Sequence, residues 1–159
     1  MPRMHVFSII LLSALIQCCK SESSADAESD RAALDRSNRA IEQALQLETS
    51  DAAGSHGLFL RTIAEVRNRF GEMAADVLID RALQRLPNYA PAHFARAESL
   101  FLRGQAPAAI TEANIALEFT DASNEAEVGR IHRLLANAHR LNDQVDAVRE
   151  QRDWLRRMR

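Results

Sequence analysis

Histidine is the side chain best suited to acid–base and metal chemistry near neutral pH, and this chain contains five of them. His132 and His139 stand seven residues apart. On a helix that spacing is about 10 Å of rise, which is too far for both rings to hold one metal ion. His56 and His93 have no cysteine or paired carboxylate at ligand spacing. The histidines therefore predict neither a metal site nor a catalytic pair.

Other patterns that carry catalysis are also missing from the sequence. Lys20 is the only lysine, so there is no phosphate loop with a Gly-Lys pair and no Schiff-base lysine in the rest of the chain. Neither a nucleophile elbow nor a His-Glu metal motif occurs. Asp143, Asp146 and Glu150 are spaced like the solvated face of a helix. We expect no enzyme, no cofactor or metal, and no small-molecule substrate.

Composition favours a single all-helical domain. The chain has 159 residues, of which 47% are hydrophobic and 5% are aromatic, with only five glycines and four prolines. Many of the remaining residues are Ala, Leu, Arg, Glu and Gln, whose side chains lose little freedom in a helix. The formal net charge is −2, whereas a nucleic-acid-binding protein usually carries a basic surplus. We therefore expect no nucleic-acid partner.

The N-terminus differs from the rest of the chain. An apolar run of about eleven residues, 6–16, follows Arg3 and is too short to cross a bilayer, which needs about 20 residues. It fits the apolar core of a secretory signal peptide. Cys18 and Cys19 follow directly, and a stretch rich in Ser, Asp and Glu extends over residues 21–30.

An apolar run, a cysteine and a polar stretch in this order resemble a bacterial lipoprotein signal. In that family the cysteine is acylated, and the residue before it is usually Gly, Ala or Ser. The large Gln17 precedes Cys18, but the small Cys18 precedes Cys19, so the resemblance favours Cys19, with Cys18 as the alternative. It implies a signal peptide over 1–18, a flexible polar tether over 19–29 and a lipid-anchored protein of the cell envelope that faces the periplasm. Simple cleavage or an uncleaved anchor are the alternatives to lipidation.

The rest of the chain, residues 30–159, is predicted to be one helical domain. Apolar residues recur at three and four positions over residues 30–47, which predicts a helix with Asp30 as its N-cap. A repeat follows: Ala75 and Ala82 recur 34 residues later as Ala109 and Ala116. Residues 120–124 read as a turn inserted into this repeat.

A period of 34 residues made of two helices resembles the tetratricopeptide repeat. The best unit spans 90–123, where Ala97 and Ala109 are the small residues of the two helices, Gly104 ends the first helix and Pro107 lies in the first turn of the second. We expect further units over 57–87, with Ala64 and Ala75, and over 126–158, with Ala136 and Ala147. In these two units the alanines are eleven residues apart instead of twelve, which predicts a tighter turn.

The resemblance implies a right-handed superhelix of about three antiparallel helical hairpins, preceded by one extra helix. In this family the first helix of each pair lines a concave groove that holds a partner protein or peptide. Arg133 and Asn137 are one helical turn apart, so both could reach one anionic group. Transferring the groove face to this chain predicts the following partner-binding residues: Arg61, Glu65, Asn68, Arg69, Phe94, Glu98, Phe101, Arg130, Arg133, Asn137 and Arg140.

We therefore expect a non-catalytic adaptor of the envelope that binds a segment of a partner protein in this groove. The alternative is a structural component of an outer-membrane or secretion machine, similar in layout to the tetratricopeptide lipoproteins that assist such assemblies. The solvated-face interpretation stays open for each groove residue, and Phe94 and Phe101 could belong to the core.

Overall fold

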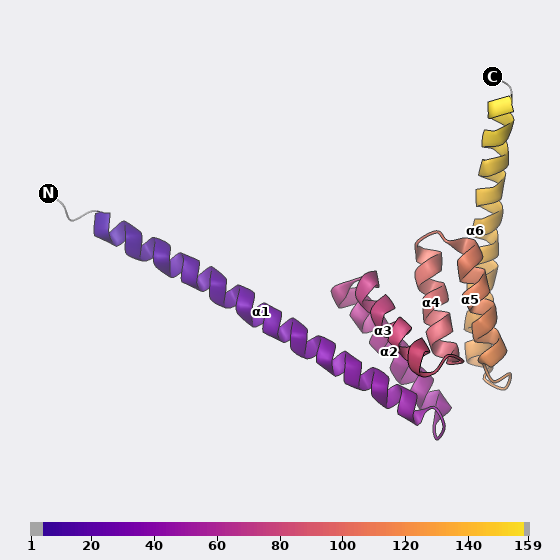
Figure 1. Ribbon diagram of the computed structural model, residues 1–159, viewed down its shortest axis with the longest axis horizontal. Helices are drawn as coiled ribbons and strands as arrows, with labels where there is room; N and C mark the ends of the chain where they lie inside the picture. Colours follow the sequence, from indigo (N-terminus) through magenta and orange to yellow (C-terminus); the bar gives the residue numbers. More distant parts are fainter. Residues whose placement is uncertain (1–4, 158–159) are drawn as a thin grey trace. The chain divides into compact units, whose positions relative to one another are not determined.

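The computed structural model describes the backbone of residues 5–157 and the side chains of residues 25–146. Within this part the chain is all-helical and has no strand. The helices are α1 (His5–Leu47), α2 (Ala52–Phe70), α3 (Glu72–Arg85), α4 (Ala90–Leu102), α5 (Ala106–Phe119) and α6 (Glu125–Arg157) (Figure 1). The predicted all-α class is confirmed.

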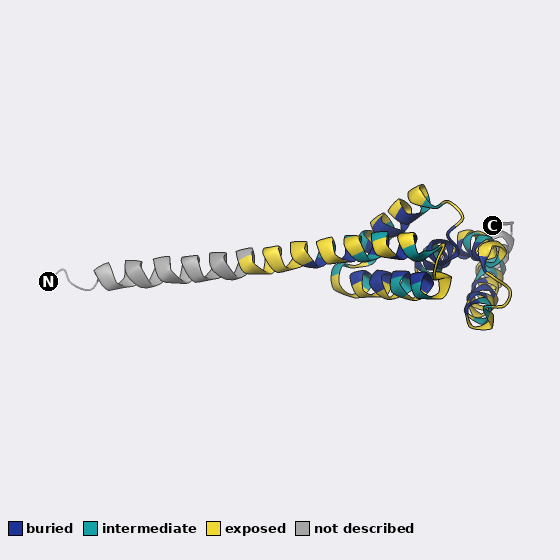
Figure 2. Cartoon of the chain, turned by 90° about the horizontal axis from the view of Figure 1, so that it is seen from below, coloured by how far each residue is buried: buried dark blue, intermediate teal, exposed yellow. Residues whose placement is uncertain are grey.

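The chain divides into two compact units, Met1–Arg39 and Ala40–Arg159. The second unit holds the end of α1 and all of α2 to α6. In it each helix from α2 to α5 packs on the next one, and α4 also packs on α2 and on α6. Figure 2 shows the buried residues of this unit, in dark blue, on the helix faces that meet one another.

Two apolar clusters form the core of the second unit, and α4 contributes to both. One cluster joins the end of α1 to α2, α3 and α4 around Phe59, Ile63 and Ile79. The other joins α4, α5 and α6 around Phe94 and Ile131. α4 therefore links the two clusters, and the partly buried Leu60 of α2 packs against both.

Small residues allow the helices to approach closely. Eleven alanines among the described residues of the second unit have no exposed surface. Five of them are alanines of the repeat named above: Ala75, Ala82, Ala97, Ala109 and Ala116. The predicted breaks are also confirmed. Gly104 has φ +72°, which glycine adopts without a steric penalty, and Pro107 lies in the first turn of α5.

The prediction that Ala64 and Ala136 are the inward-facing alanines of the flanking units is wrong. Ala64 and Ala136 are exposed, whereas the preceding residues, Ile63 and Leu135, are buried in the core. Ile63 lies twelve residues before Ala75, the same spacing as in the best unit. The choice of Ala64 as the inward residue of the 57–87 unit is therefore wrong, because Ile63 occupies that position. The connection itself is short, as predicted: Gly71 alone separates α2 from α3, whereas residues 103–105 separate α4 from α5.

The prediction of a third hairpin is also wrong. Residues 126–158 were expected to fold back, but α6 continues as one helix from Glu125 to Arg157. No glycine or proline follows Gly129 to break it, and Asn142 Nδ2 donates to Asp146 Oδ2 (3.1 Å) one turn further along the helix. The described chain thus contains two helical pairs, α2 with α3 and α4 with α5, followed by a single long helix.

The start of the first helix differs from the prediction as well. α1 ends at Leu47 as expected, but it begins at His5, so Asp30 lies within the helix and is not its N-cap. Residues 25–29, assigned to the tether, are helical and exposed. The acidic, serine-containing stretch lacks a proline or glycine that would end a helix. The signal peptide over 1–18 and the two cysteines lie outside the residues whose side chains are described.

Ala109 offers a test of this close packing. We expect Ala109→Leu to lower the free energy of unfolding by about 1–3 kcal/mol, because the larger side chain must displace neighbours in a filled contact. Ala108→Leu is the matched control, since Ala108 is exposed in the same helix and its replacement should change stability by less than about 0.5 kcal/mol. Urea denaturation followed by circular dichroism measures both. Equal effects of the two variants would contradict a close helix contact at Ala109.

Candidate functional site

A cleft of about 390 Å³ opens in the second unit between α2, α4 and α6. α4 forms its floor, since α4 packs on both neighbours while α2 and α6 have no comparable backbone contact in the described residues. α2 and α6 therefore form its two walls. Its lining residues are Leu60, Ile63, Ala64 and Arg67 of α2, Phe94 and Glu98 of α4, and Arg130, Arg133, Leu134 and Asn137 of α6.

The cleft is apolar in its depth and cationic at the α6 wall. Phe94 and Leu134 are buried core residues whose surfaces contribute to the lining. The guanidinium of Arg130 lies 5.9 Å from the centre of the Phe94 ring, at cation–π distance. Arg133 is exposed and has no hydrogen bond or ion pair with any described residue. Asn137, one turn on, accepts a hydrogen bond from Arg140 Nη2 (3.2 Å).

Arg67 holds the opposite wall in place through a polar network. Its side chain is 17% exposed; Nε lies 2.9 Å from Glu72 Oε1, and Nη2 donates to Ser99 Oγ (3.0 Å). Nη1 lies 3.6 Å from Glu98 Oε2. Ser99 in turn donates to Glu72 Oε2 (3.1 Å). The charge of Arg67 is thus shared between two carboxylates and does not add free positive charge to the cleft.

Glu98 is the one acidic residue in the lining. Burial raises the pKa of its carboxyl group, while the positive charges of Arg67 and Arg130 lower it only in part, so the pKa stays above its ordinary value. Since Glu98 faces Arg67, the arginines of α6 dominate the electrostatic character of the open side. The cleft is therefore suited to a ligand with an apolar group and a carboxylate.

One end of the cleft is joined by a buried ion pair between its two walls. His56 of α2 is 8% exposed and Glu127 of α6 is 2% exposed. His56 Nδ1 lies 2.7 Å from Glu127 Oε2, and Nε2 lies 3.1 Å from Glu48 Oε1. Both ring nitrogens thus face carboxylate oxygens, which only accept hydrogen bonds, so His56 must be an imidazolium to donate to both.

The pKa of His56 agrees with this geometry. Burial alone would lower it, but the hydrogen bonds and negative charges of Glu127 and Glu48 outweigh burial and raise the pKa above its usual value of about 6.5. Glu127 Oε2 also accepts from Asn124 Nδ2 (2.8 Å), whereas Glu127 Oε1 is buried with no hydrogen-bond partner among the described residues. This carboxylate therefore depends strongly on the imidazolium.

A chain of hydroxyl groups completes the cluster around His56. Ser55 Oγ donates to Glu48 Oε2 (2.7 Å) and lies 2.8 Å from Tyr89 OH. Since the Ser55 proton goes to Glu48, the Tyr89 hydroxyl donates to Ser55. Burial raises the pKa of Tyr89 well above its ordinary value, which keeps this hydroxyl protonated. The cluster thus joins the connections before α2 and α4 to the first turns of α2 and α6.

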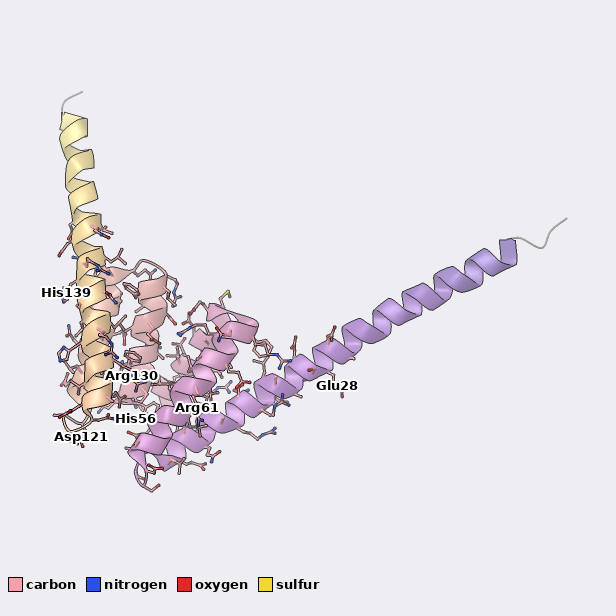
Figure 3. The ribbon with its side chains drawn as sticks, turned by 180° about the vertical axis from the view of Figure 1, so that it is seen from behind. Glu28, His56, Arg61, Asp121, Arg130 and His139 are labelled. Atoms are coloured by element: carbon pink, nitrogen blue, oxygen red, sulfur yellow. The ribbon has the colours of Figure 1, made fainter. Side chains whose placement is uncertain are left out.

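The structure brings together five of the eleven predicted groove residues, and they line the cleft: Phe94, Glu98, Arg130, Arg133 and Asn137. Figure 3 shows Arg130 on α6 and Arg61 on α2. The other six do not belong to the lining: Arg61, Glu65, Asn68, Arg69, Phe101 and Arg140. Among them, Phe101 is half-buried and packs on the core, and Arg69 lies over the ring of Phe70.

The prediction did not identify the lining residues of α2, because it placed the inward face of this helix one residue out of register. The lining residues Leu60, Ile63, Ala64 and Arg67 follow the three-and-four spacing of one helix face. The prediction treated Ala64 as an inward contact, which rotates the helix by about 100° and selects Arg61, Glu65 and Asn68. The spacing of twelve residues between Ile63 and Ala75 was the signal that would have placed this face correctly.

Comparisons with protein-family models, curated proteins and solved structures find no match to this chain. Among the residues that the structure describes, none of the helices has the length and apolar character needed to cross a membrane. Residues 25–146 contain no group of three or more His, Cys, Asp or Glu side chains that could hold a metal ion. The interpretation of the cleft therefore rests on its own geometry and chemistry.

The Arg67 network leads to a testable prediction about the α2 wall. We expect Arg67→Ala to lower the free energy of unfolding by about 2 kcal/mol, since it leaves the partly buried carboxylates of Glu72 and Glu98 without their charged donor. Arg61→Ala is the matched control: Arg61 is exposed on the same helix and donates only to Gly57 O. Chemical denaturation of both variants tests the difference, and an Arg67→Ala protein as stable as Arg61→Ala would contradict the network.

Proposed function

We propose that this chain is a non-catalytic adaptor that holds a short segment of a partner protein in the cleft between α2, α4 and α6. The observation that carries the proposal is an apolar floor beside an arginine, Arg133, that has no partner among the described residues. A partly buried charge pair such as Arg67 with Glu72 supports the wall, whereas an unpaired exposed arginine is free to bind a ligand.

The chemistry of the lining defines the segment that would fit. An aliphatic or aromatic side chain would occupy the apolar part of the cleft, which is formed by Phe94 of the floor and by Leu60 and Leu134 of the walls. A carboxylate beside it would be held by Arg133, with the side-chain amide of Asn137 one turn further along the helix. The volume of about 390 Å³ lies within the range of small-ligand pockets and would take one or two side chains and not a folded domain.

The stacking of the helices supports a tetratricopeptide-like arrangement for the second unit. Sequential packing of two helical pairs and a further helix, with fully buried alanines at the contacts, is what such repeats require. In our proposal α2, α4 and α6 act as the groove-lining helices of a right-handed superhelix, and α6 closes the array in place of a third hairpin.

Peptide binding tests the function directly. A peptide library displayed on phage, selected on the full chain, should yield sequences that combine an apolar residue with a neighbouring Asp or Glu. A selected peptide should lose affinity by about tenfold in Arg133→Ala, because one charge-assisted hydrogen bond is removed. Arg140→Ala is the matched control, since Arg140 lies on the same helix but outside the lining. Fluorescence anisotropy measures both affinities.

The outcome also separates the adaptor from an assembly component. Equal losses in Arg133→Ala and Arg140→Ala would place the binding face elsewhere. If no peptide is selected but chemical cross-linking in the native envelope captures a large complex through the outer surfaces of α3 or α5, the cleft is not the docking site. In that case the chain acts as a structural part of a larger machine.

We further propose export to the cell envelope, with an acyl anchor on Cys19. We expect the double variant Cys18→Ser, Cys19→Ser to move from the membrane fraction to the soluble fraction, because a lost acyl chain removes about 0.8 kcal/mol of membrane affinity per buried methylene. Cys18→Ser alone should stay with the membrane, and Cys19→Ser alone should be released. Fractionation and mass spectrometry of the N-terminal peptide test this; unchanged partition of the double variant rules out the anchor.

A further inference from the structure

The ion pair between His56 and Glu127 joins the two walls of the cleft near the starts of their helices. His56 lies one turn before Leu60 on α2, and Glu127 lies one turn before Arg130 on α6. On both walls, therefore, the lining residues follow the pair along the helix. Figure 3 shows His56 near the start of α2 and Arg130 near the start of α6. The pair joins the walls at the end from which both helices run.

The backbone provides no comparable link between these walls. α4 packs on α2 and on α6, but α2 and α6 share no such contact in the described residues. A direct side-chain bond of 2.7 Å at one end thus limits how far the two walls can separate. The rest of α2 and α6 forms the two sides of the cleft. A change in the separation of the helices at this end would therefore change the width of the whole cleft.

We propose that His56 and Glu127 form a clasp that positions α2 against α6 and sets the width of the cleft, and that the clasp opens when His56 loses its proton. The opening itself is a property of the fold. Its effect on ligand affinity rests on the function proposed above. His56 is a positioning residue here, because it does not line the cleft and would not touch the bound segment.

The charged and titratable groups around His56 determine the direction of the switch. Glu48 approaches from the connection before α2 and Glu127 from α6, and both bring negative charge to the ring. The Tyr89 ring meets the imidazole edge-on with centroids 5.7 Å apart, and its hydroxyl stays neutral. Ser55 is bound to Glu48 and Tyr89 and offers no replacement charge.

When His56 loses its proton, Glu48 and Glu127 no longer have a positive charge between them. A neutral imidazole can donate from one nitrogen only, so a lone pair would face one of the two carboxylates. Glu127 is destabilised more than Glu48 by this loss, since its side chain is buried and its Oε1 has no hydrogen-bond partner among the described residues. An uncompensated buried carboxylate is costly, and separating α6 from α2 exposes it to water.

The sign of the pH dependence follows from the raised pKa of His56. A histidine whose pKa is higher in the folded than in the unfolded state stabilises the fold fully below its unfolded value of about 6.5. That stabilisation is lost as the pH rises through the folded value. The clasp should therefore be closed in mildly acidic conditions and open progressively above about pH 6.5.

Distance measurements across the cleft test the clasp. Spin labels at Glu65→Cys on α2 and Arg140→Cys on α6, in the full chain with Cys18→Ser and Cys19→Ser, report the separation of the walls by pulsed electron paramagnetic resonance. We expect one narrow distance at about pH 5.5 and a longer, broader distribution at about pH 9, with a midpoint above about 6.5. A distribution that stays the same over this range overturns the proposal.

Variants separate positioning from general stability. His56→Gln should remove the pH response, and Glu127→Gln should shift its midpoint to lower pH, because the ring loses a negative neighbour. His93→Gln is the matched control. His93 is similarly buried and bonds to Glu112 (2.8 Å) and Pro87 O (2.8 Å), but it joins α4 to α5 and not the two walls. Its variant should keep the wild-type pH response. Circular dichroism at each pH confirms that every variant is folded.

The same samples distinguish failure of the clasp from failure of the proposed function. With a peptide selected on the wild-type chain, we expect affinity to fall by about three- to tenfold between pH 5.5 and pH 9, and to be less pH-dependent in His56→Gln. A pH-dependent distance without peptide binding at any pH leaves the clasp intact and removes the adaptor function. Peptide binding with an invariant distance removes the clasp and leaves the function.

Discussion

The constraint on which this fold depends is that α4 must be packed on both sides at once. Eight of its thirteen residues are buried. Ala92 and Ala95 belong to one apolar cluster, and Phe94 and Ala97 belong to the other. Such a helix cannot be accommodated by bulky neighbours, because helices with large facing side chains stay further apart. Alanines at 75, 97, 109 and 116 with no exposed surface solve this problem. Alanine buries little apolar area, so these four residues stabilise the fold mainly by allowing the helix backbones to approach closely.

The same constraint leaves a cleft on one side of α4. Because α3 and α5 cover the other side, α2 and α6 are held apart by the width of the helix between them, and their facing side chains become walls. The depth of the cleft is then apolar, since core residues contribute to its lining: Phe94 in the floor and Leu134 at the base of the α6 wall. Polar groups enter from the walls: Arg67 is neutralised by two carboxylates, whereas Arg133 is not. The chemical asymmetry of the cleft therefore follows from which arginine has acidic neighbours.

Much of this architecture could be predicted from the sequence, but not its register or its long-range polar contacts. The helical class and the turns at Gly104 and 120–124 depend on local chemistry, which a single sequence shows directly. The orientation of α2 depends on whether Ile63 or Ala64 faces α3, and a spacing error of one residue rotates the face by about 100°. The prediction of the third hairpin is wrong because recurring alanines do not end a helix, and no glycine or proline near residue 141 interrupts α6. The pairing of His56 with Glu127, 71 residues apart in sequence, has no local signature.

A buried ion pair is a costly way to join two helices, and an apolar contact at the same place would give equal or greater stability. Its presence between the cleft walls is explained better by geometry than by energy. Apolar contacts tolerate sliding, whereas an imidazolium between two carboxylates fixes α2 relative to α6 through directed bonds of 2.7 and 3.1 Å. The cluster also recruits the connections before α2 and α4 through Glu48, Ser55 and Tyr89, so the start of α2 is held on several sides. Among the described residues no further helical pair packs on α6, whose backbone packs only on α4 and α5. Directed bonds at the start of α6 supply part of the restraint that such a pair would provide.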